Sequence, residues 1–171
     1  MNSQSDAQII EVVLSGKSDA FEVMLDRYQN QIFAYVFRLL NFHRQDAEDL
    51  ASETFCRAYV NLASFNSTKK FSSWLYRIAH NLVIDEYSKR SHCISVDLQE
   101  IDIPAIAEIS PSSKADLQKI LAKLSLEDRE ILILFYTEEK SIKEIATILK
   151  ILPGTVKVRL HRAKAKAKKF T

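Results

Sequence analysis

Apolar residues recur at three- and four-residue steps along most of the chain, the spacing that places them on one face of an α-helix. A short apolar segment from Ile9 to Leu14 predicts a first helix that ends near Gly16. Residues 19–40 predict a longer helix. Its buried stripe is expected to contain Phe21, Met24, Leu25, Tyr28, Ile32, Phe33, Val36 and Leu39.

Two further amphipathic patterns follow. Asp46 is a candidate cap for the first, whose inward positions are Leu50, Phe55, Ala58, Tyr59 and Leu62. After a polar loop, residues 64–70, the second runs from Phe71 to about Lys89 with Trp74, Leu75, Ile78, Leu82 and Val83 inward. Three long helices and a short leading one can enclose a single core.

The character of the chain changes between Ser91 and Ser113. This stretch holds Pro104, Pro111 and several Ser, and it has no long amphipathic pattern. We expect residues 91–113 to be a linker between an N-terminal domain, residues 1–90, and a C-terminal domain, residues 114–171. The isolated Ile and Leu residues of the linker either lie on a partner's surface or belong to a solvated tether.

Four helices are expected after the linker, at residues 115–124, 126–136, 142–149 and 155–169. Ser125 is placed to cap the second of them, with Asp128 in the position of the capping-box Glu. With only two Gly and three Pro in 171 residues, the sequence favours long helices. The predicted fold is all-α: two small helical domains joined by a linker.

Residues 141–162 have the pattern of a helix-turn-helix. Ala146 is small at a position where two helices must approach closely. Pro153 and Gly154 are expected to end one helix and to allow the next one to begin. The inner faces are assigned to Ile145 and Leu149 on the first helix and to Val156 and Leu160 on the second. The second helix would then lie in the major groove of DNA.

The remaining faces of that second helix are predicted to contact DNA. Lys157 or Arg159 can bind guanine edges, and the amides at the helix start can bind a phosphate. Lys164, Lys166, Lys168 and Lys169 either extend this basic surface or form a solvated helix end. The predicted DNA contacts are Thr155, Lys157, Val158, Arg159, His161, Arg162 and Lys164.

Charge is distributed unevenly along the chain, whose formal net charge is +2. Residues 141–171 contain nine Lys or Arg and one Glu, a net +8, which leaves −6 for the residues before them. A basic end on an acidic body suggests two partners of opposite charge.

No run approaches the roughly 20 apolar residues of a membrane helix, and the polar N-terminus lacks a signal core, so we expect a cytoplasmic protein. Cys56 and Cys93 have neither zinc nor CxxC spacing, and no metal or cofactor is expected.

Four segments together resemble the extracytoplasmic-function (ECF) group of bacterial sigma factors, in the sigma-70 family. They are residues 16–21, the acidic run 46–55, residues 71–81 with Asp85 and Arg90, and residues 154–163. The resemblance covers nearly the whole chain apart from the linker. It implies a protein that recruits RNA polymerase to a promoter and helps to open the DNA.

The resemblance assigns roles to residues of the N-terminal half. Asp46, Glu48, Asp49 and Glu53 match the motif that binds a basic coiled coil of the polymerase's largest subunit, although Ser52 stands where the family usually has Gln. A helix dipole alone also favours acids near a helix start, and it explains Asp46 and Glu48 better than the other two. The −10 promoter element would be held as a single strand with one base turned into a pocket. The residues implied there are Phe65, Asn66, Ser67, Thr68, Lys69, Lys70, Tyr76, Arg77, Asn81 and Arg90.

By the same resemblance, the C-terminal domain would bind duplex −35 DNA and the polymerase flap, and an anti-sigma factor would be a further partner. Apolar surfaces that are exposed in the absence of polymerase could be covered by an anti-sigma factor, or by packing of the two domains on each other.

The alternative function is an ordinary helix-turn-helix regulator that binds two half-sites as a dimer. Catalysis is not expected: His80 with Asp85 could be imagined as acid and base, but no nucleophile elbow, phosphate loop or Rossmann fingerprint accompanies them.

Overall fold

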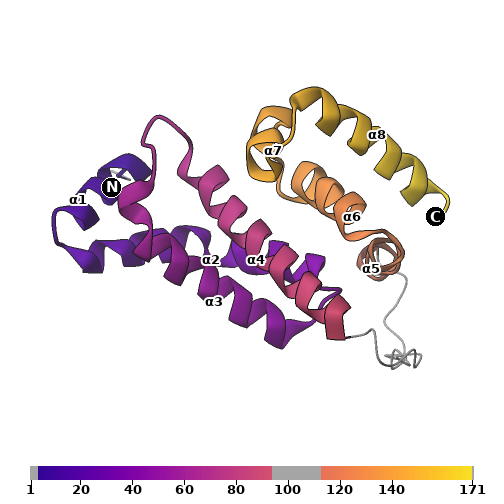
Figure 1. The fold of residues 1–171 in the computed structure, drawn as a ribbon, viewed down its shortest axis with the longest axis horizontal. Coiled ribbons are helices and arrows are strands. Elements are labelled where there is room, and N and C mark those ends of the chain that lie inside the picture. The colour runs from indigo at the N-terminus through magenta and orange to yellow at the C-terminus, as the bar shows by residue number, and fades with distance from the viewer. Residues whose placement is uncertain (1–3, 94–112, 171) are drawn as a thin grey trace.

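The computed structural model describes residues 4–93 and 113–170, and the regular elements within them are all helical (Figure 1). This confirms the predicted fold class. The first half contains α1 (Asp6–Leu14), the 3₁₀ turn η1 (Ser18–Phe21), α2 (Glu22–Leu39), α3 (Arg44–Val60), η2 (Leu62–Ser64) and α4 (Phe71–Cys93). The second half contains α5 (Ser113–Lys123), α6 (Leu126–Leu132), the π-helical turn η4 (Ile133–Thr137), α7 (Ile142–Leu149) and α8 (Pro153–Lys168).

Local chemistry sets several helix ends. Ser5 and Gln8 form a capping box at the start of α1, and Gly16 follows its end with a φ of +104°, a conformation that suits glycine. The expectation that Asp46 caps α3 is wrong. The helix begins earlier, at Arg44 after His43, and Asp46 lies within its first turn, where its carboxylate pairs with a side chain of α4.

Helices α2, α3 and α4 pack together around the core of the N-terminal half. Met24, Ile32 and Leu39 of α2 are fully buried, as the sequence pattern predicts. Phe65, Phe71 and Trp74 form an aromatic cluster in which neighbouring ring centroids lie 5.3–5.6 Å apart. This cluster fixes the loop that precedes α4 to the helix itself.

The helix-turn-helix is formed by α7 and α8. Ser141 and Glu144 make a capping box at the start of α7, and Ile145 and Val156 are fully buried between the two helices. The turn differs from the expected one. Lys150 ends α7 in the left-handed conformation, with a φ of +53°, whereas Pro153 and Gly154 already belong to the first turn of α8.

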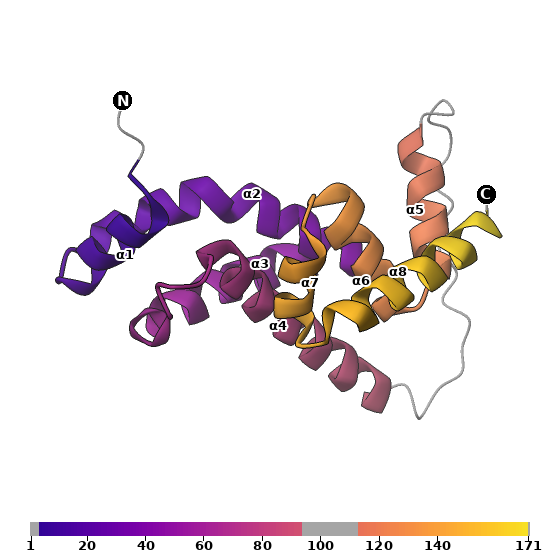
Figure 2. The same cartoon turned by 90° about the horizontal axis from the view of Figure 1, so that it is seen from above.

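The two halves pack against each other. Helix α7 contacts α4, and α6 with η4 contacts α2, so one continuous apolar core extends through both halves. Figure 2 shows α7 lying over α4, with α8 running away from that contact toward α5. The predicted linker, residues 91–113, overlaps the end of α4 and the start of α5, and residues 94–112 lie outside the described residues.

Candidate functional site

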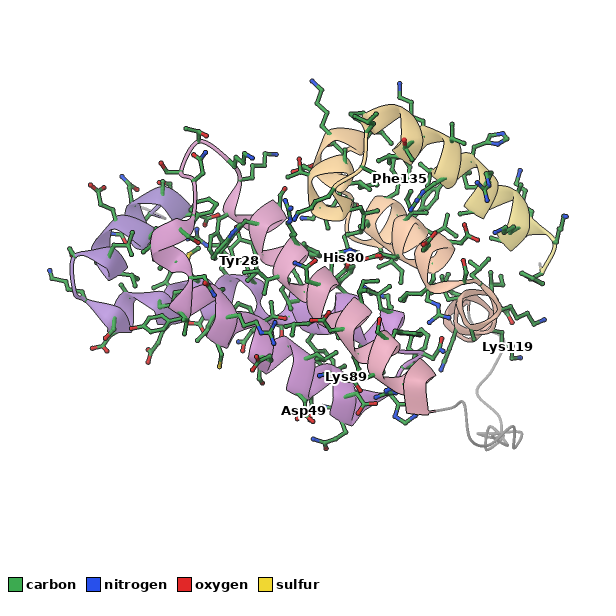
Figure 3. All side chains as sticks on the ribbon, in the orientation of Figure 1. Tyr28, Asp49, His80, Lys89, Lys119 and Phe135 are labelled. Atoms are coloured by element: carbon green, nitrogen blue, oxygen red, sulfur yellow. The ribbon has the colours of Figure 1, made fainter. Side chains whose placement is uncertain are left out.

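Three of the four predicted polymerase-binding acids lie on the outer face of α3. Glu48, Asp49 and Glu53 are exposed, and Figure 3 shows Asp49 on the outer side of that helix. Their neighbours on the helix bind them only loosely: Arg44 pairs with Glu48 and Arg57 pairs with Glu53, each at 2.8 Å between solvent-exposed side chains. Such surface pairs are weak, about 0.3–0.5 kcal/mol each, so a partner can replace them.

The fourth acid, Asp46, has a different environment. Its Oδ2 accepts a hydrogen bond from Nη2 of Arg90 at 2.7 Å, and Arg90 also pairs with Glu86 at 2.9 Å. Both hydrogen bonds raise the pKa of Arg90, and the one to Asp46 has the larger effect. Asp46 and Arg90, which the sequence assigns to two different interfaces, therefore tie α3 to α4 in this structure.

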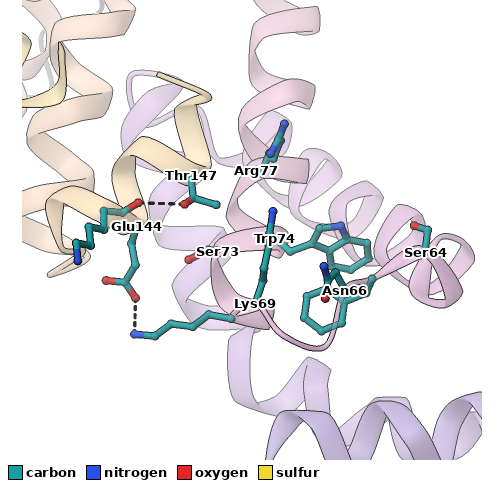
Figure 4. Close-up of a pocket in the computed structure, with 11 residues that line it drawn as sticks. Ser64, Asn66, Lys69, Ser73, Trp74, Arg77, Glu144 and Thr147 are labelled. Atoms are coloured by element: carbon teal, nitrogen blue, oxygen red, sulfur yellow. Dashed lines mark hydrogen bonds and ion pairs between the residues drawn. The ribbon is translucent and has the colours of Figure 1, made fainter. Parts of the chain in front are cut away.

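The loop predicted to hold an unpaired base borders a pocket of about 420 Å³ (Figure 4). Phe65, Asn66, Lys69 and Lys70 of the loop contribute to its lining. Helix α4 adds Ser73, Trp74 and Arg77. The side chain of Asn66 accepts hydrogen bonds from the amide and hydroxyl of Thr68, at 3.0 and 2.7 Å, and so shapes the loop. Trp74, which the sequence pattern predicts to point inward, packs against the core and also lines this pocket.

The other side of the pocket belongs to the helix-turn-helix. Lys143, Glu144 and Thr147 of α7 complete the lining, and Nζ of Lys70 lies 2.9 Å from Oε1 of Glu144. Burial alone would raise the pKa of Glu144, but hydrogen bonds from Lys70 and Ser141 outweigh it and lower that pKa to about 2. No sequence pattern predicts that α7 faces the loop.

Five predicted −10 contacts are not part of the pocket lining: Ser67, Thr68, Tyr76, Asn81 and Arg90. Asn81 is exposed on α4 one turn beyond Arg77. Tyr76 is fully buried, and its hydroxyl donates to Oε2 of Glu138 at 2.5 Å. Burial, with Glu138 beside it, raises the pKa of Tyr76, so the hydroxyl remains a donor. In this arrangement the C-terminal half covers Tyr76.

The basic face of α8 is open. Lys157, Val158, His161, Arg162 and Lys164 are exposed, whereas Val156, Leu160 and Ala163 are buried beneath them. The two remaining predicted contacts, Thr155 and Arg159, are partly buried. Nη1 of Arg159 lies 3.7 Å from Glu127, a contact too long and too exposed to hold the guanidinium. The N-cap position is occupied by Leu152, which has no side-chain acceptor for the first-turn amides.

A buried polar network joins the two halves, and sequence reasoning missed it. Arg129 donates to the carbonyl of Leu39 at 2.6 Å and to the hydroxyl of Tyr87 at 3.2 Å. Glu130 accepts from the hydroxyl of Tyr35 at 2.5 Å and lies 2.7 Å from Nδ1 of His80. Figure 3 shows His80 where α4 faces α6. The sequence pattern does not predict these contacts, because Arg129 and Glu130 are charged and charged residues are expected at the surface.

A second hollow, an apolar groove of about 280 Å³, lies in the C-terminal half between α5, η4 and α8. Leu117 and Tyr136 at its rim are 40% and 51% exposed, large values for apolar side chains beside a core. Lys164 and Lys168 of α8 add cations to one edge. The groove therefore suits an apolar segment that carries acidic residues.

Comparison with known proteins identifies the two halves separately. Residues 24–93 match the model of sigma-70 region 2, and residues 114–166 match that of sigma-70 region 4. The chain is 37% identical to the ECF RNA polymerase sigma factor SigW of Bacillus subtilis over 94% of its length and 93% of that protein. The chain belongs to the ECF sigma factors. This sigma factor is also 32% identical to the RNA polymerase sigma factor YlaC of the same organism, over 88% of the chain and 91% of YlaC.

Solved structures share the fold of this sigma factor. The sigma factor RpoE of Bartonella quintana, in complex with the anti-sigma factor NepR, superimposes with a TM-score of 0.74 at 25% identity, over 88% of this chain and 95% of RpoE. CnrH, in complex with the cytosolic domain of CnrY, gives a TM-score of 0.73 at 24% identity, over 97% and 96% of the two chains, and shows the likeness of fold alone.

Membership of the family establishes what this sigma factor does. It is an alternative sigma factor for transcription initiation, a DNA-binding regulator that acts with RNA polymerase at promoters. The alternative hypothesis of an ordinary helix-turn-helix regulator is not favoured.

Among residues 4–93 and 113–170 no group of three or more His, Cys, Asp or Glu is placed to hold a metal ion. Over the same residues no helix combines the length and apolar character needed to cross a bilayer.

Proposed function

We propose that this sigma factor, acting in the cytoplasm, divides promoter opening among three surfaces. Helix α3 binds the polymerase, the loop of residues 65–70 with α4 holds the single-stranded −10 element, and α8 binds duplex −35 DNA. The observation that carries the proposal is the separation of charge: exposed acids gather on α3, while exposed bases gather on α8. The family matches support domain boundaries near residues 90 and 114.

The acidic surface of α3 suits a basic coiled coil of the largest polymerase subunit. Asp49 and Glu53 lie one turn apart on one exposed face, the spacing at which carboxylates meet a row of Lys and Arg. Both are already solvated, so binding does not require the breaking of a buried contact. Asp46 would contribute less, because Arg90 already neutralises it.

The loop and the first turns of α4 offer the chemistry needed for an unpaired base. Turning a base out of a duplex costs a few kcal/mol, and stacking on an aromatic ring returns about 1–3 kcal/mol per base. Trp74 and Phe65 supply aromatic surface at the pocket, and Asn66 supplies an amide. Lys69 and Arg77, which also line the pocket, would bind the phosphates on either side of that base. Asn81, which is already exposed on α4, would extend this surface, and Tyr76 would join it once the C-terminal half moves away.

The recognition helix α8 presents its predicted contacts on the faces that surround its buried stripe of Val156, Leu160 and Ala163. Thr155 and the free amides of the first turn would bind a phosphate, and Lys157 or Arg159 would reach base edges in the major groove. Val158, which is 59% exposed, would make apolar contact with a thymine methyl group. His161, Arg162 and Lys164 would bind the backbone farther along the helix.

The apolar groove of the C-terminal half is the proposed site for the polymerase flap. An apolar segment with acidic residues would fill the space beside Leu117 and Tyr136 and meet Lys164 and Lys168 at the edge. An anti-sigma factor is the second expected partner of this surface. The likeness to RpoE, which was solved with the anti-sigma factor NepR, supports that expectation.

Charge reversal on α3 tests the polymerase interface. The double variant Asp49→Lys/Glu53→Lys should lose at least tenfold in affinity for core polymerase, since like charges then face each other. Its circular dichroism and its binding to −35 duplex should match those of the parent. The control is Glu11→Lys/Glu22→Lys, which makes the same charge change at exposed positions of α1 and α2. Equal polymerase affinity for the folded double variant and its parent refutes the assignment.

A further inference from the structure

The pocket of about 420 Å³ is built by both halves of the chain, and its lining combines aromatic, cationic and hydroxyl groups. Its volume lies within the range of about 300–1,000 Å³ that is usual for small-molecule sites. Figure 4 shows Lys69, Trp74 and Arg77 on the α4 side, facing Glu144 and Thr147 of α7 across the pocket. A small molecule bound here would therefore contact both halves at once.

Positive charge predominates in the lining. One carboxylate, that of Glu144, faces four cationic residues, which are Lys69, Lys70, Arg77 and Lys143. Lys70 already pairs with Glu144 at 2.9 Å. Within residues 4–93 and 113–170, the other three cations form no ion pair. Because hydrogen bonds between cations and phosphate oxygens are strong, the pocket favours an anion that carries several negative charges.

Aromatic and polar side chains favour a planar group in the same ligand. The rings of Phe65 and Trp74 both line the pocket, with centroids 5.3 Å apart, and any nucleobase can stack on such a ring. Ser73 is only 4% exposed, and its hydroxyl points toward α7 (Figure 4). Asn66 accepts from Thr68 through Oδ1, so its amide nitrogen can still donate to a base or a ribose.

We propose that this pocket binds a free nucleoside polyphosphate when the two halves are packed together, with the base against Trp74 and the phosphates beside Lys69 and Arg77. A free nucleotide suits the pocket better than a continuous strand, because α7 completes the lining on one side. The proposed −10 base uses the same aromatic surface, so the nucleotide and the −10 strand would compete. A bound nucleotide would also link α7 to α4 and stabilise their packing.

Tryptophan fluorescence tests the proposal, because Trp74 is the single Trp of the chain. ATP and GTP are the probes, each titrated into the full-length protein. Stacking of the base should quench the emission in a saturable manner, with half of the effect below about 1 mM. Adenosine, which lacks phosphates, and tripolyphosphate, which lacks a base, should each bind at least about tenfold more weakly.

Calorimetric titration with the same four compounds measures binding independently of the quench. Absence of both quenching and binding heat for ATP and GTP up to about 5 mM overturns the proposal. Equal affinity for tripolyphosphate and for the two nucleotides also overturns it, because the pocket would then be an anion site that does not recognise the base.

A charge introduced into the α7 wall tests the location of the site. Thr147 is exposed, lines the pocket and is not a predicted DNA contact. Thr147→Glu should weaken nucleotide binding about tenfold, since the phosphates then meet a second carboxylate. The control, Gln118→Glu, makes the same charge change at an exposed position of α5 and should bind as the parent does. Parent-like affinity in Thr147→Glu, with a parent-like circular dichroism spectrum, overturns the proposal.

Run-off transcription with core polymerase separates this inference from the proposed function. Transcripts from a protein that binds neither ATP nor GTP would overturn the nucleotide site and leave the proposed function intact. Nucleotide binding at the pocket by a protein that yields no transcript would support the site and refute the proposed function.

Discussion

Replacement of Arg129 by Gln should destabilise the whole protein, because this side chain joins three parts of it. Arg129 is 3% exposed. Its guanidinium donates to the carbonyls of Leu121, Leu124 and Leu39, at 2.8, 3.0 and 2.6 Å. The first two belong to α5 and the turn after it, and the third ends α2 in the other half.

The magnitude follows from the number and kind of bonds. A hydrogen bond from a charged donor contributes about 1.5–3 kcal/mol, and an acceptor left unpaired in the interior costs about 1–3 kcal/mol. Gln at position 129 can satisfy one of the three carbonyls, and such terms are not additive. We expect the free energy of unfolding to fall by about 3–5 kcal/mol. For a chain of this size the melting temperature should then fall by about 6–20 °C.

Thermal denaturation followed by far-ultraviolet circular dichroism measures the effect. The matched control is Arg57→Gln, which removes an exposed pair with Glu53 and should cost about 0.3–0.5 kcal/mol. A melting temperature for Arg129→Gln within about 2 °C of the control would mean that the buried guanidinium contributes no more than a surface pair, which refutes the reasoning.

Three further outcomes are expected. Arg159→Ala should reduce the salt dependence of duplex binding by about one unit of slope, and an unchanged slope counts against a phosphate contact. Ala146→Leu should cost about 1–3 kcal/mol in urea denaturation, because its side chain is 8% exposed against α8; no loss would mean a looser helix-turn-helix. The pKa of Glu144 is lowered from 4.5 to about 2, so its stabilising effect is full above pH 4.5 and disappears as the pH falls toward 2. The stability difference between the parent and Glu144→Gln should shrink over that range, and a constant difference contradicts the ion pair with Lys70.

The helical fold could be predicted because apolar periodicity and capping residues agree along the chain. Helix α7 has the predicted bounds, and Ser125 accepts the amide hydrogen bond of Asp128 as expected of a cap. The turn after α7 was predicted less well. Proline and glycine suggested the break, but Lys150 takes the left-handed conformation, and proline is compatible with the first turn of a helix.

The packing of the two halves could not be predicted in detail. Its contacts come from Arg38, Arg129, Glu130 and Glu138, and a sequence pattern assigns such charged residues to the surface. Their partners lie about 50 to 100 residues away in the sequence, and rules based on local sequence cannot predict such pairs. The polymerase, −10 and −35 residues came from the family resemblance and the helix-turn-helix pattern, and their assignments remain predictions.

Run-off transcription from a pool of promoter fragments, with purified core polymerase and this sigma factor, tests the central claim most directly. The account predicts transcripts that start at discrete positions when both components are present. Core polymerase alone should give none, and Asp49→Lys/Glu53→Lys should lose most of the product while Glu11→Lys/Glu22→Lys retains it. Discrete transcripts of equal yield with and without this sigma factor would contradict the account.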